Sequence, residues 1–244
     1  MIDEEIKKWV KFARALDTDS DGVADPYKIC YQLGIDVVIR NLEKDGYLIC
    51  TDGCKMVFVN SKINNKHRKR FIAAHELGHF LLHDESMYCC SNLNDADIDQ
   101  LNTYNQEYQA NQFASELLLP EDALYDSLPE KEITFSDISQ IADQFNVSMT
   151  MCARKSVGMS KTGKELLLFY SEDRLKWSAT GNGILLSPDW MGGCATRYSK
   201  LTNQIGTIPK WKRSVADANN SISYFSTYGN QKMVLISDIE QFLD

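Results

Sequence analysis

Residues 70–83 read RFIAAHELGHFLLH. The stretch is rich in Ala, Leu and Phe and contains no Pro, so it predicts a helix, which we extend from Lys66 to His83. His75 and His79 stand four residues apart. On a helix this spacing places both imidazoles on one face, about 6 Å apart along the axis. Two nitrogen ligands of a single metal ion need this arrangement.

Glu76 directly follows the first of these histidines. It would project beside a bound metal ion, where it can take a proton from a metal-bound water. The pattern is typical of zinc proteases, in which the carboxylate later gives this proton to the leaving amine. A helix that merely carries core or surface histidines is the alternative interpretation. Candidates for stabilising the oxyanion are Tyr104, Tyr108 and His67.

A catalytic zinc ion takes three protein ligands and keeps one position open. A third histidine six residues after His79 is absent, because Glu85 occupies that position. If the helix continues, His83 would lie about 12 Å from His75 along the axis, too far to bind the same ion. The third ligand is therefore expected to be a carboxylate from another segment.

A second predicted helix, Thr103 to Leu119, offers such a carboxylate. Glu107 and Asn111 share a face of this helix, so Glu107 can bind the ion while Asn111 hydrogen-bonds a ligand imidazole from behind. Other acidic candidates stay open at this point, namely Glu116 on the same helix and Asp95, Asp97 and Asp99 in the preceding polar stretch.

Three segments together resemble the ImmA/IrrE family of metallopeptidases. They are residues 25–35 (DPYKICYQLGI), residues 70–83, and residues 107–120 (EYQANQFASELLLP). The resemblance extends over residues 1–158 and implies a gluzincin-like, and thus zincin-like, fold. It further implies that zinc is bound by His75, His79 and Glu107, and that Glu76 is the catalytic acid and base. Ile72 is a small departure, since Thr is common there in the family.

The resemblance also implies a biological role, because members of the family are bacterial or mobile-element regulators that cleave helix-turn-helix repressors. We therefore expect a cytoplasmic zinc metalloendopeptidase that acts on a protein substrate. That substrate would be a helix-turn-helix repressor, whose cleavage derepresses genes of a mobile element or a stress response. The alternative is a non-catalytic metal-binding regulator that binds a repressor or another partner.

The pattern along the chain predicts an α+β fold that begins with a zincin-like metallopeptidase domain, residues 1–158. Helices are expected at 3–16, 26–33, 121–127, 136–146 and 148–157, and strands at 35–39, 47–51 and 56–60. Asp45-Gly46 and Asp52-Gly53 are the expected hairpin turns between the strands. The last of these strands, residues 56–60, is a candidate for pairing with an extended substrate segment.

A joint at residues 158–163 is predicted to lead into a small β-rich C-terminal domain, residues 164–244. Its expected strands are 166–170, 183–186, 221–225 and 233–236. All four histidines of the chain precede residue 84. This domain is therefore expected to regulate activity or dock substrate, and a chain ending near Gly158 is expected to fold and keep one metal ion.

Composition argues against several other classes of protein. The net charge of −8 disfavours a primary nucleic-acid binder. No apolar run approaches the roughly 20 residues needed to span a bilayer, and no signal sequence is evident, so no membrane partner is expected. The seven cysteines fit free thiols in a reducing compartment, and the pairs Cys50/Cys54 and Cys89/Cys90 lack the spacing of a zinc site.

Two further motifs are discounted. DTDSDG at residues 17–22 imitates the start of a calcium loop, but Lys28 stands where a bidentate Glu belongs, so a polar turn is predicted. Residues 136–157 resemble a helix-turn-helix core, which makes a DNA-binding regulator the third hypothesis. The second helix has basic residues only at Arg154 and Lys155, which favours packing within the peptidase domain over DNA binding.

Overall fold

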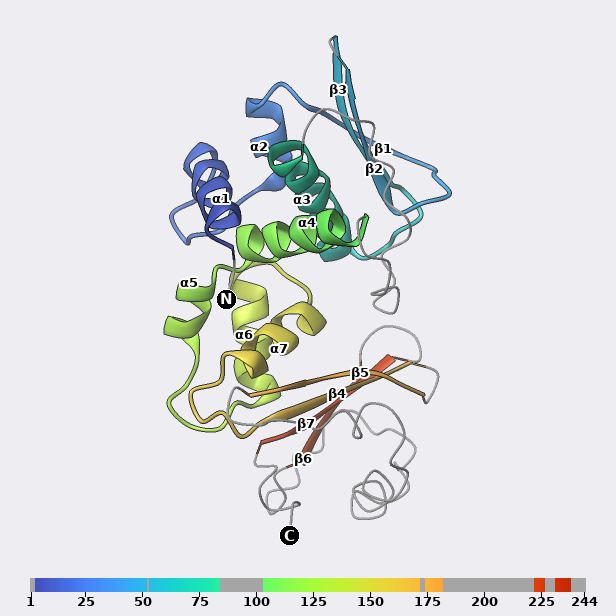
Figure 1. Cartoon of the computed structure of the whole chain (residues 1–244). Helices are drawn as coiled ribbons and strands as arrows, with labels where there is room; N and C mark the ends of the chain where they lie inside the picture. Colours follow the sequence, from blue (N-terminus) through green and yellow to red (C-terminus); the bar gives the residue numbers. More distant parts are fainter. Residues whose placement is uncertain are drawn as a thin grey trace. The chain divides into compact units, whose positions relative to one another are not determined.

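The computed structural model (Figure 1) describes residues 3–51, 53–83, 103–171, 174–181, 222–226 and 231–237. Helices and strands are mixed, in agreement with the predicted α+β class. The chain divides into two compact units, residues 1–121 with 143–148, and residues 122–142 with 149–244. Within the described ranges, no helix has both the length and the apolar character needed to cross a membrane.

The first unit combines helices with a three-stranded sheet. Its described elements are α1 (Glu4–Leu16), α2 (Pro26–Gln32), β1 (Asp36–Arg40), β2 (Gly46–Thr51), β3 (Cys54–Asn60), α3 (Lys66–Leu82) and α4 (Thr103–Leu118). The side chains of Asp3, Asp25 and Asn65 accept hydrogen bonds from the first backbone N–H groups of α1, α2 and α3. These short polar caps determine where the three helices begin.

Strand β3 is the centre of this sheet, with β1 parallel on one side and β2 antiparallel on the other. The second predicted hairpin is confirmed, because Thr51 pairs with Cys54. The first is wrong, because β1 and β2 are not neighbours. Instead Asn60 holds their connection by donating from Nδ2 to the carbonyls of Leu42 at 3.0 Å and Lys44 at 2.9 Å. The prediction that a substrate pairs with residues 56–60 is also wrong, since both edges of β3 are used.

Helix α3 is the core of the first unit. Every residue from Ile72 to His79 is buried, and the helix packs against α4, β2 and β3. A helix buried around its whole circumference has no solvent face on which polar side chains could find water. His75, Glu76 and His79 therefore lie in the protein interior, where polar groups need polar partners.

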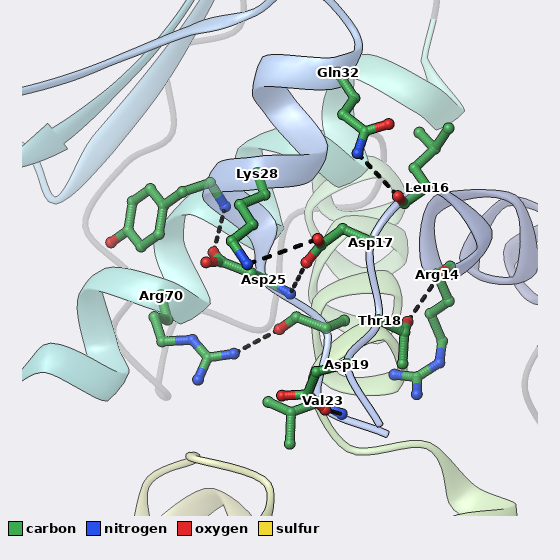
Figure 2. A network of polar contacts seen from close by, with 12 residues as sticks. Arg14, Leu16, Asp17, Thr18, Asp19, Val23, Asp25, Lys28, Gln32 and Arg70 are labelled. Atoms are coloured by element: carbon green, nitrogen blue, oxygen red, sulfur yellow. Dashed lines mark hydrogen bonds and ion pairs between the residues drawn. The ribbon is translucent and has the colours of Figure 1, made fainter. Parts of the chain in front are cut away.

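The acidic loop at residues 17–25 satisfies its own polar groups (Figure 2). Asp19 Oδ1 accepts from the backbone N–H of Asp21 at 3.0 Å and from that of Val23 at 2.8 Å. Asp17 accepts from the N–H of Asp25 and lies 3.8 Å from Lys28 Nζ. The predicted polar turn is confirmed. In the part of the chain that the structure describes, these carboxylates do not form a metal-binding group.

Two arginines tie this loop to the helices of the first unit. Arg14 donates to the carbonyls of Gly22 and Leu117, both at 2.7 Å. Arg70 is buried and donates to the carbonyls of Ala24 at 2.6 Å and Asn146 at 3.0 Å. Because charged donors make the stronger hydrogen bonds, these two side chains anchor the loop to α4 and to α3.

The second unit contains mainly α5 (Glu121–Ser127), α6 (Phe135–Gln144) and α7 (Met149–Gly158) with a four-stranded antiparallel sheet. Its strands are β4 (Leu166–Ser171), β5 (Arg174–Thr180), β6 (Ile222–Ser226) and β7 (Gln231–Ile236), in the order β5-β4-β7-β6. Strand β5 is absent from the sequence-based prediction. The strand predicted at residues 183–186 lies outside the described residues.

The joint predicted at residues 158–163 is a hydrogen-bonded turn. Glu165 is fully buried and accepts hydrogen bonds from the hydroxyls of Ser160 and Thr162, the latter at 2.6 Å. Lys161 forms an ion pair with Glu130 at 2.7 Å. These contacts connect the turn to the rest of the second unit. Whether residues 1–158 and 164–244 are separate domains stays a prediction, because contacts in the folded chain do not show which part folds alone.

Helices α6 and α7 occupy the segment that resembles a helix-turn-helix core. Helix α7 packs on β4 and β5, and the guanidinium of Arg154 lies 5.4 Å from the centroid of the Trp177 ring. Helix α7 of this segment therefore has a packing surface on the sheet of the second unit. That the segment packs within the peptidase domain and does not bind DNA stays a prediction.

We expect the four described cysteines to differ in reactivity. Burial raises the pKa of the Cys30 thiol to about 12 and that of Cys152 to about 11, whereas Cys50 and Cys54 are partly exposed. Iodoacetamide at pH 8 should therefore modify Cys50 and Cys54 before Cys30 and Cys152, as followed by peptide mass spectrometry. Protein unfolded in guanidinium is the control. Rapid native labelling of Cys30 or Cys152 would contradict this expectation.

Candidate metal centre

Helices α3 and α4 approach each other closely at Gly78. A Cβ atom at this position would lie 3.0 Å from Phe113 Cδ1, 3.2 Å from Ala110 Cα and 3.3 Å from Ala110 O. Such distances are tighter than ordinary van der Waals contacts, so a glycine is needed here. Gly78 lies between His75 and His79, and Ala110 lies between Glu107 and Asn111. The close approach therefore brings the polar residues of both helices together.

The two histidines and Glu107 converge on one point. The Nε2 atoms of His75 and His79 are 3.1 Å apart. Glu107 places Oε2 3.2 Å from His75 Nε2 and Oε1 3.5 Å from His79 Nε2. Two ligands at about 2.1 Å from a tetrahedral ion stand about 3.4 Å apart. The three side chains thus have the spacing of a tetrahedral metal site.

The three side chains differ in their exposure to solvent. The side chains of His75 and His79 are 0% and 1% exposed, whereas that of Glu107 is 25% exposed. Among the described residues, these three form the group of His, Cys, Asp or Glu side chains that could hold a metal ion. Two imidazoles and one carboxylate are the ligand set of many catalytic zinc sites, which keep a fourth position for water or substrate. The residues present therefore fit a catalytic divalent metal.

Both histidines have partners on their outer nitrogen atoms. His75 Nδ1 donates to Asn111 Oδ1 at 3.0 Å, which confirms the predicted contact of Asn111 with a ligand imidazole. His79 Nδ1 lies 3.1 Å from His83 Nδ1, and His83 Nε2 lies 3.0 Å from Gln109 Oε1. His83 is not part of the converging group. It follows the end of α3 and does not continue the helix, and its exclusion as a ligand stays a prediction. Burial holds the pKa of His83 below its usual value.

Glu107 is an anionic carboxylate at neutral pH. Burial by itself would raise its pKa, but the hydrogen bonds and the charges of His75 and His79 outweigh that effect and hold the pKa well below the usual range. A carboxylate that is already deprotonated can bind a cation without first losing a proton. Glu107 is thus available as an anionic ligand for a cation.

Glu76 lies beside this group and is 1% exposed. It faces the start of β2, where a Cβ at Gly46 would lie 3.1 Å from Glu76 Oε1 and 2.4 Å from Ile72 Cγ2. Only a glycine allows the strand to pass this close to the carboxylate. The edge strand β2 therefore begins next to the residue expected to act as acid and base.

The other sequence candidates lie elsewhere or lie outside the described residues. Glu116 accepts from the N–H of Glu121 at 2.9 Å and so contributes to the start of α5. His67 Nδ1 lies 3.0 Å from the carbonyl of Asn146, which leaves Tyr108, half exposed on α4, as a described oxyanion candidate. The candidates outside the described side chains are Tyr104, Asp95, Asp97 and Asp99.

Sequence analysis missed three contributors to this site: Gly46, Gly78 and Gln109. The two glycines act through close approaches between segments that are distant in sequence. Gln109 acts through a side-chain contact across 26 residues. The Gly of the HELGH stretch was visible in the sequence, but its role depends on Ala110 and Phe113, which no local pattern connects to it.

Comparisons with known proteins show the family to which this chain belongs. The sequence model of the peptidase M78 family, described as the IrrE N-terminal-like domain, matches residues 30–156. "Metallopeptidase ImmA" of Bacillus subtilis (strain 168) is 32% identical over 127 residues, which are 52% of this chain and 71% of that protein. "Uncharacterized immunity region protein 2" of Bacillus phage phi105 is 30% identical over 118 residues, covering 48% of this chain and 71% of the phage protein.

One solved structure is similar across nearly the whole chain. It is a "Mycobacterium tuberculosis transcriptional regulator", with a TM-score of 0.58 and 13% sequence identity, covering 98% of this chain and 77% of that one. At this identity the likeness concerns the fold alone. The matched sequence model and the relatives together show that this chain belongs to the ImmA/IrrE (M78) family of metallopeptidases.

Proposed function

We propose that this chain is a zinc-dependent endopeptidase in which His75, His79 and Glu107 bind the metal and Glu76 is the general base and acid. The observation that carries the proposal is the convergence of two buried imidazoles and one anionic carboxylate from α3 and α4. A zincin-like peptidase fold accounts for this arrangement, with the active-site helix α3 packed on a sheet whose edge strand β2 is nearby.

Each residue has a distinct task in this mechanism. A bound zinc ion supplies a Lewis acid that polarises the scissile carbonyl and makes water more acidic. Glu76 takes the proton from the attacking water and gives it to the amine that leaves. Burial of Glu76 keeps bulk water away from this transfer. Asn111 and the outer hydrogen bonds hold the imidazoles in place, so that they need not reorganise during the reaction.

An extended peptide can reach these groups along β2. This strand is at the edge of the described sheet, and it starts at Gly46 beside Glu76. Backbone groups on an edge strand can add a further strand, which gives affinity for an unfolded or extended segment with little dependence on its sequence. We therefore assign substrate binding to the outer edge of β2 instead of β3.

The proposed substrate is a helix-turn-helix repressor, whose cleavage derepresses genes of a mobile element or a stress response. Support comes from the family resemblance and from the phage relative, which is named as an immunity region protein. In this proposal residues 164–244 form a β-rich regulatory or substrate-docking domain, because none of the metal ligands or Glu76 lies in them. A non-catalytic regulator that binds a repressor is the second candidate, and the Glu76 variant below distinguishes the two.

Glu76→Gln should retain the metal and lose peptidase activity. The amide keeps the size of the side chain but cannot accept a proton, so cleavage of a candidate repressor should fall by about 10²- to 10⁴-fold or more. Purified protein is incubated with the repressor and zinc, with and without chelator, and fragments are followed by mass spectrometry. Equal cleavage by wild type and variant would remove Glu76 from the mechanism.

At the same saturating zinc concentration, alanine at His75, His79 or Glu107 should each leave the protein with less than one bound ion, because two remaining ligands hold zinc weakly. His83→Ala tests the exclusion of His83 as a ligand, since His83 is not in the converging group: under these conditions it should still take up one ion, whatever its affinity. Elemental analysis measures the stoichiometry. Full metal content in the Glu107 variant, or its loss in the His83 variant alone, would reverse the ligand assignment.

Gly78→Ala should weaken both the fold and the metal site. The added methyl group meets the backbone of Ala110, so overpacking should cost about 1–3 kcal/mol and outweigh the better helix propensity of alanine. Gly158→Ala is the control, because nothing lies within 4 Å of a Cβ at that helical position. Urea unfolding and competition with a zinc chelator measure the effects. Wild-type stability and zinc affinity in the Gly78 variant would show that the approach of α3 and α4 is not limiting.

A further inference from the structure

His79 has a different kind of support from His75. The outer nitrogen of His75 bonds directly to an amide oxygen, Asn111 Oδ1. The outer nitrogen of His79 bonds to a second imidazole, His83 Nδ1 at 3.1 Å, and the far side of that imidazole meets Gln109 Oε1 at 3.0 Å. Gln109, His83 and His79 thus form a continuous chain of side chains that ends at the proposed metal position.

The backbone holds His83 in this place. Helix α3 ends at Leu82, and His83 has an extended conformation with φ −123° and ψ 139°. Its backbone N–H still donates to the carbonyl of His79 at 3.1 Å. The two imidazole rings consequently remain close, with centroids 5.1 Å apart and planes tilted by 52°. The position of the His83 ring is therefore set by the end of α3, the helix that carries His75 and His79.

Only one arrangement of protons along this chain allows His79 to bind a metal. His79 Nε2 must present a lone pair, so its proton sits on Nδ1. That N–H must donate to His83 Nδ1, which therefore carries a lone pair, and the proton of His83 sits on Nε2. The Nε2–H in turn donates to Gln109 Oε1, which can only accept. The opposite direction would place a proton on His79 Nε2 and exclude the metal.

We propose that Gln109 and His83 are positioning residues that fix the tautomer and orientation of His79, so that its Nε2 lone pair faces the metal. The inference rests on the proposed function, because it requires His79 to be a ligand. It assigns α4 a wider role than the supply of Glu107. The same helix provides Asn111 behind His75 and Gln109 behind His83, so all three proposed ligands depend on its position.

Four variants separate this role from simple packing. His83→Leu removes the acceptor for His79, whereas His83→Asn retains one, since an Asn Oδ1 can take the place of Nδ1. Gln109→Ala removes the terminal acceptor, and Asn105→Ala removes an exposed amide from the same helix. Zinc dissociation constants come from chelator competition, and the folded state of each metal-free protein is checked by circular dichroism.

We expect His83→Leu and Gln109→Ala to weaken zinc binding by roughly 10- to 100-fold, the usual effect of removing a partner behind a metal ligand. His83→Asn should restore affinity to near wild type, and Gln109→Ala should have no further effect in that background. Asn105→Ala should bind zinc as wild type does. Cobalt-substituted protein should show an altered visible spectrum in His83→Leu and a near-normal one in His83→Asn.

Two results would overturn the proposal. One is wild-type zinc affinity in both His83→Leu and Gln109→Ala. The other is equal loss in His83→Leu and His83→Asn, which would mean that the ring is needed for packing and not as an acceptor. If instead the wild-type protein binds no zinc, or His79→Ala binds it normally, the proposed metal centre itself fails. Should His83→Leu not fold, the Gln109 variant and the Asn variant still decide the question.

Discussion

Helices α3 and α4 can bring His75, His79 and Glu107 together only because Gly78 lets their backbones approach without a side chain between them. A methyl group at this point would meet the backbone of Ala110 at 3.2 Å. Protein interiors are close-packed, so even one added carbon must displace a neighbour. A displacement of α4 would move Glu107 and Asn111 together, because both lie within one turn of Ala110. The geometry of the metal centre is thus a consequence of helix packing.

Other contacts of the first unit hold α3 and α4 in this close approach. Arg14 bonds to the carbonyl of Leu117 near the end of α4, and Arg70 on α3 bonds to Ala24 and Asn146. The acidic loop at residues 17–25 offers carbonyl acceptors to both arginines, Gly22 to Arg14 and Ala24 to Arg70. Figure 2 shows the bond from Arg70. The carboxylates of this calcium-like sequence accept hydrogen bonds from the loop's own backbone. Its carbonyl groups accept from the two arginines and so connect the loop to the helices.

Burial of polar groups costs free energy unless each group has a hydrogen-bond partner. In this site a single helix, α4, supplies those partners. Helix α4 supplies the carboxylate that faces both imidazoles and the amides that stand behind them, directly for His75 and through His83 for His79. Such outer contacts spare the imidazoles the loss of hydrogen bonds that burial would otherwise cause. One helix thus carries the two histidines, and the next supplies Glu107 and the amides that support them.

Local pattern was enough to predict the elements that depend on neighbouring residues. Helical periodicity placed His75 and His79 on one face and predicted a helix that starts at Lys66, as α3 does. The family resemblance singled out Glu107 from several acidic residues. Strand order could not be predicted, because the parallel pairing of β1 with β3 leaves no signal in the turns between them. Strand β5, the roles of Gly46 and Gly78, and the contact of Gln109 with His83 could not be predicted either. These features arise where distant segments meet, and only tertiary packing determines which segments those are.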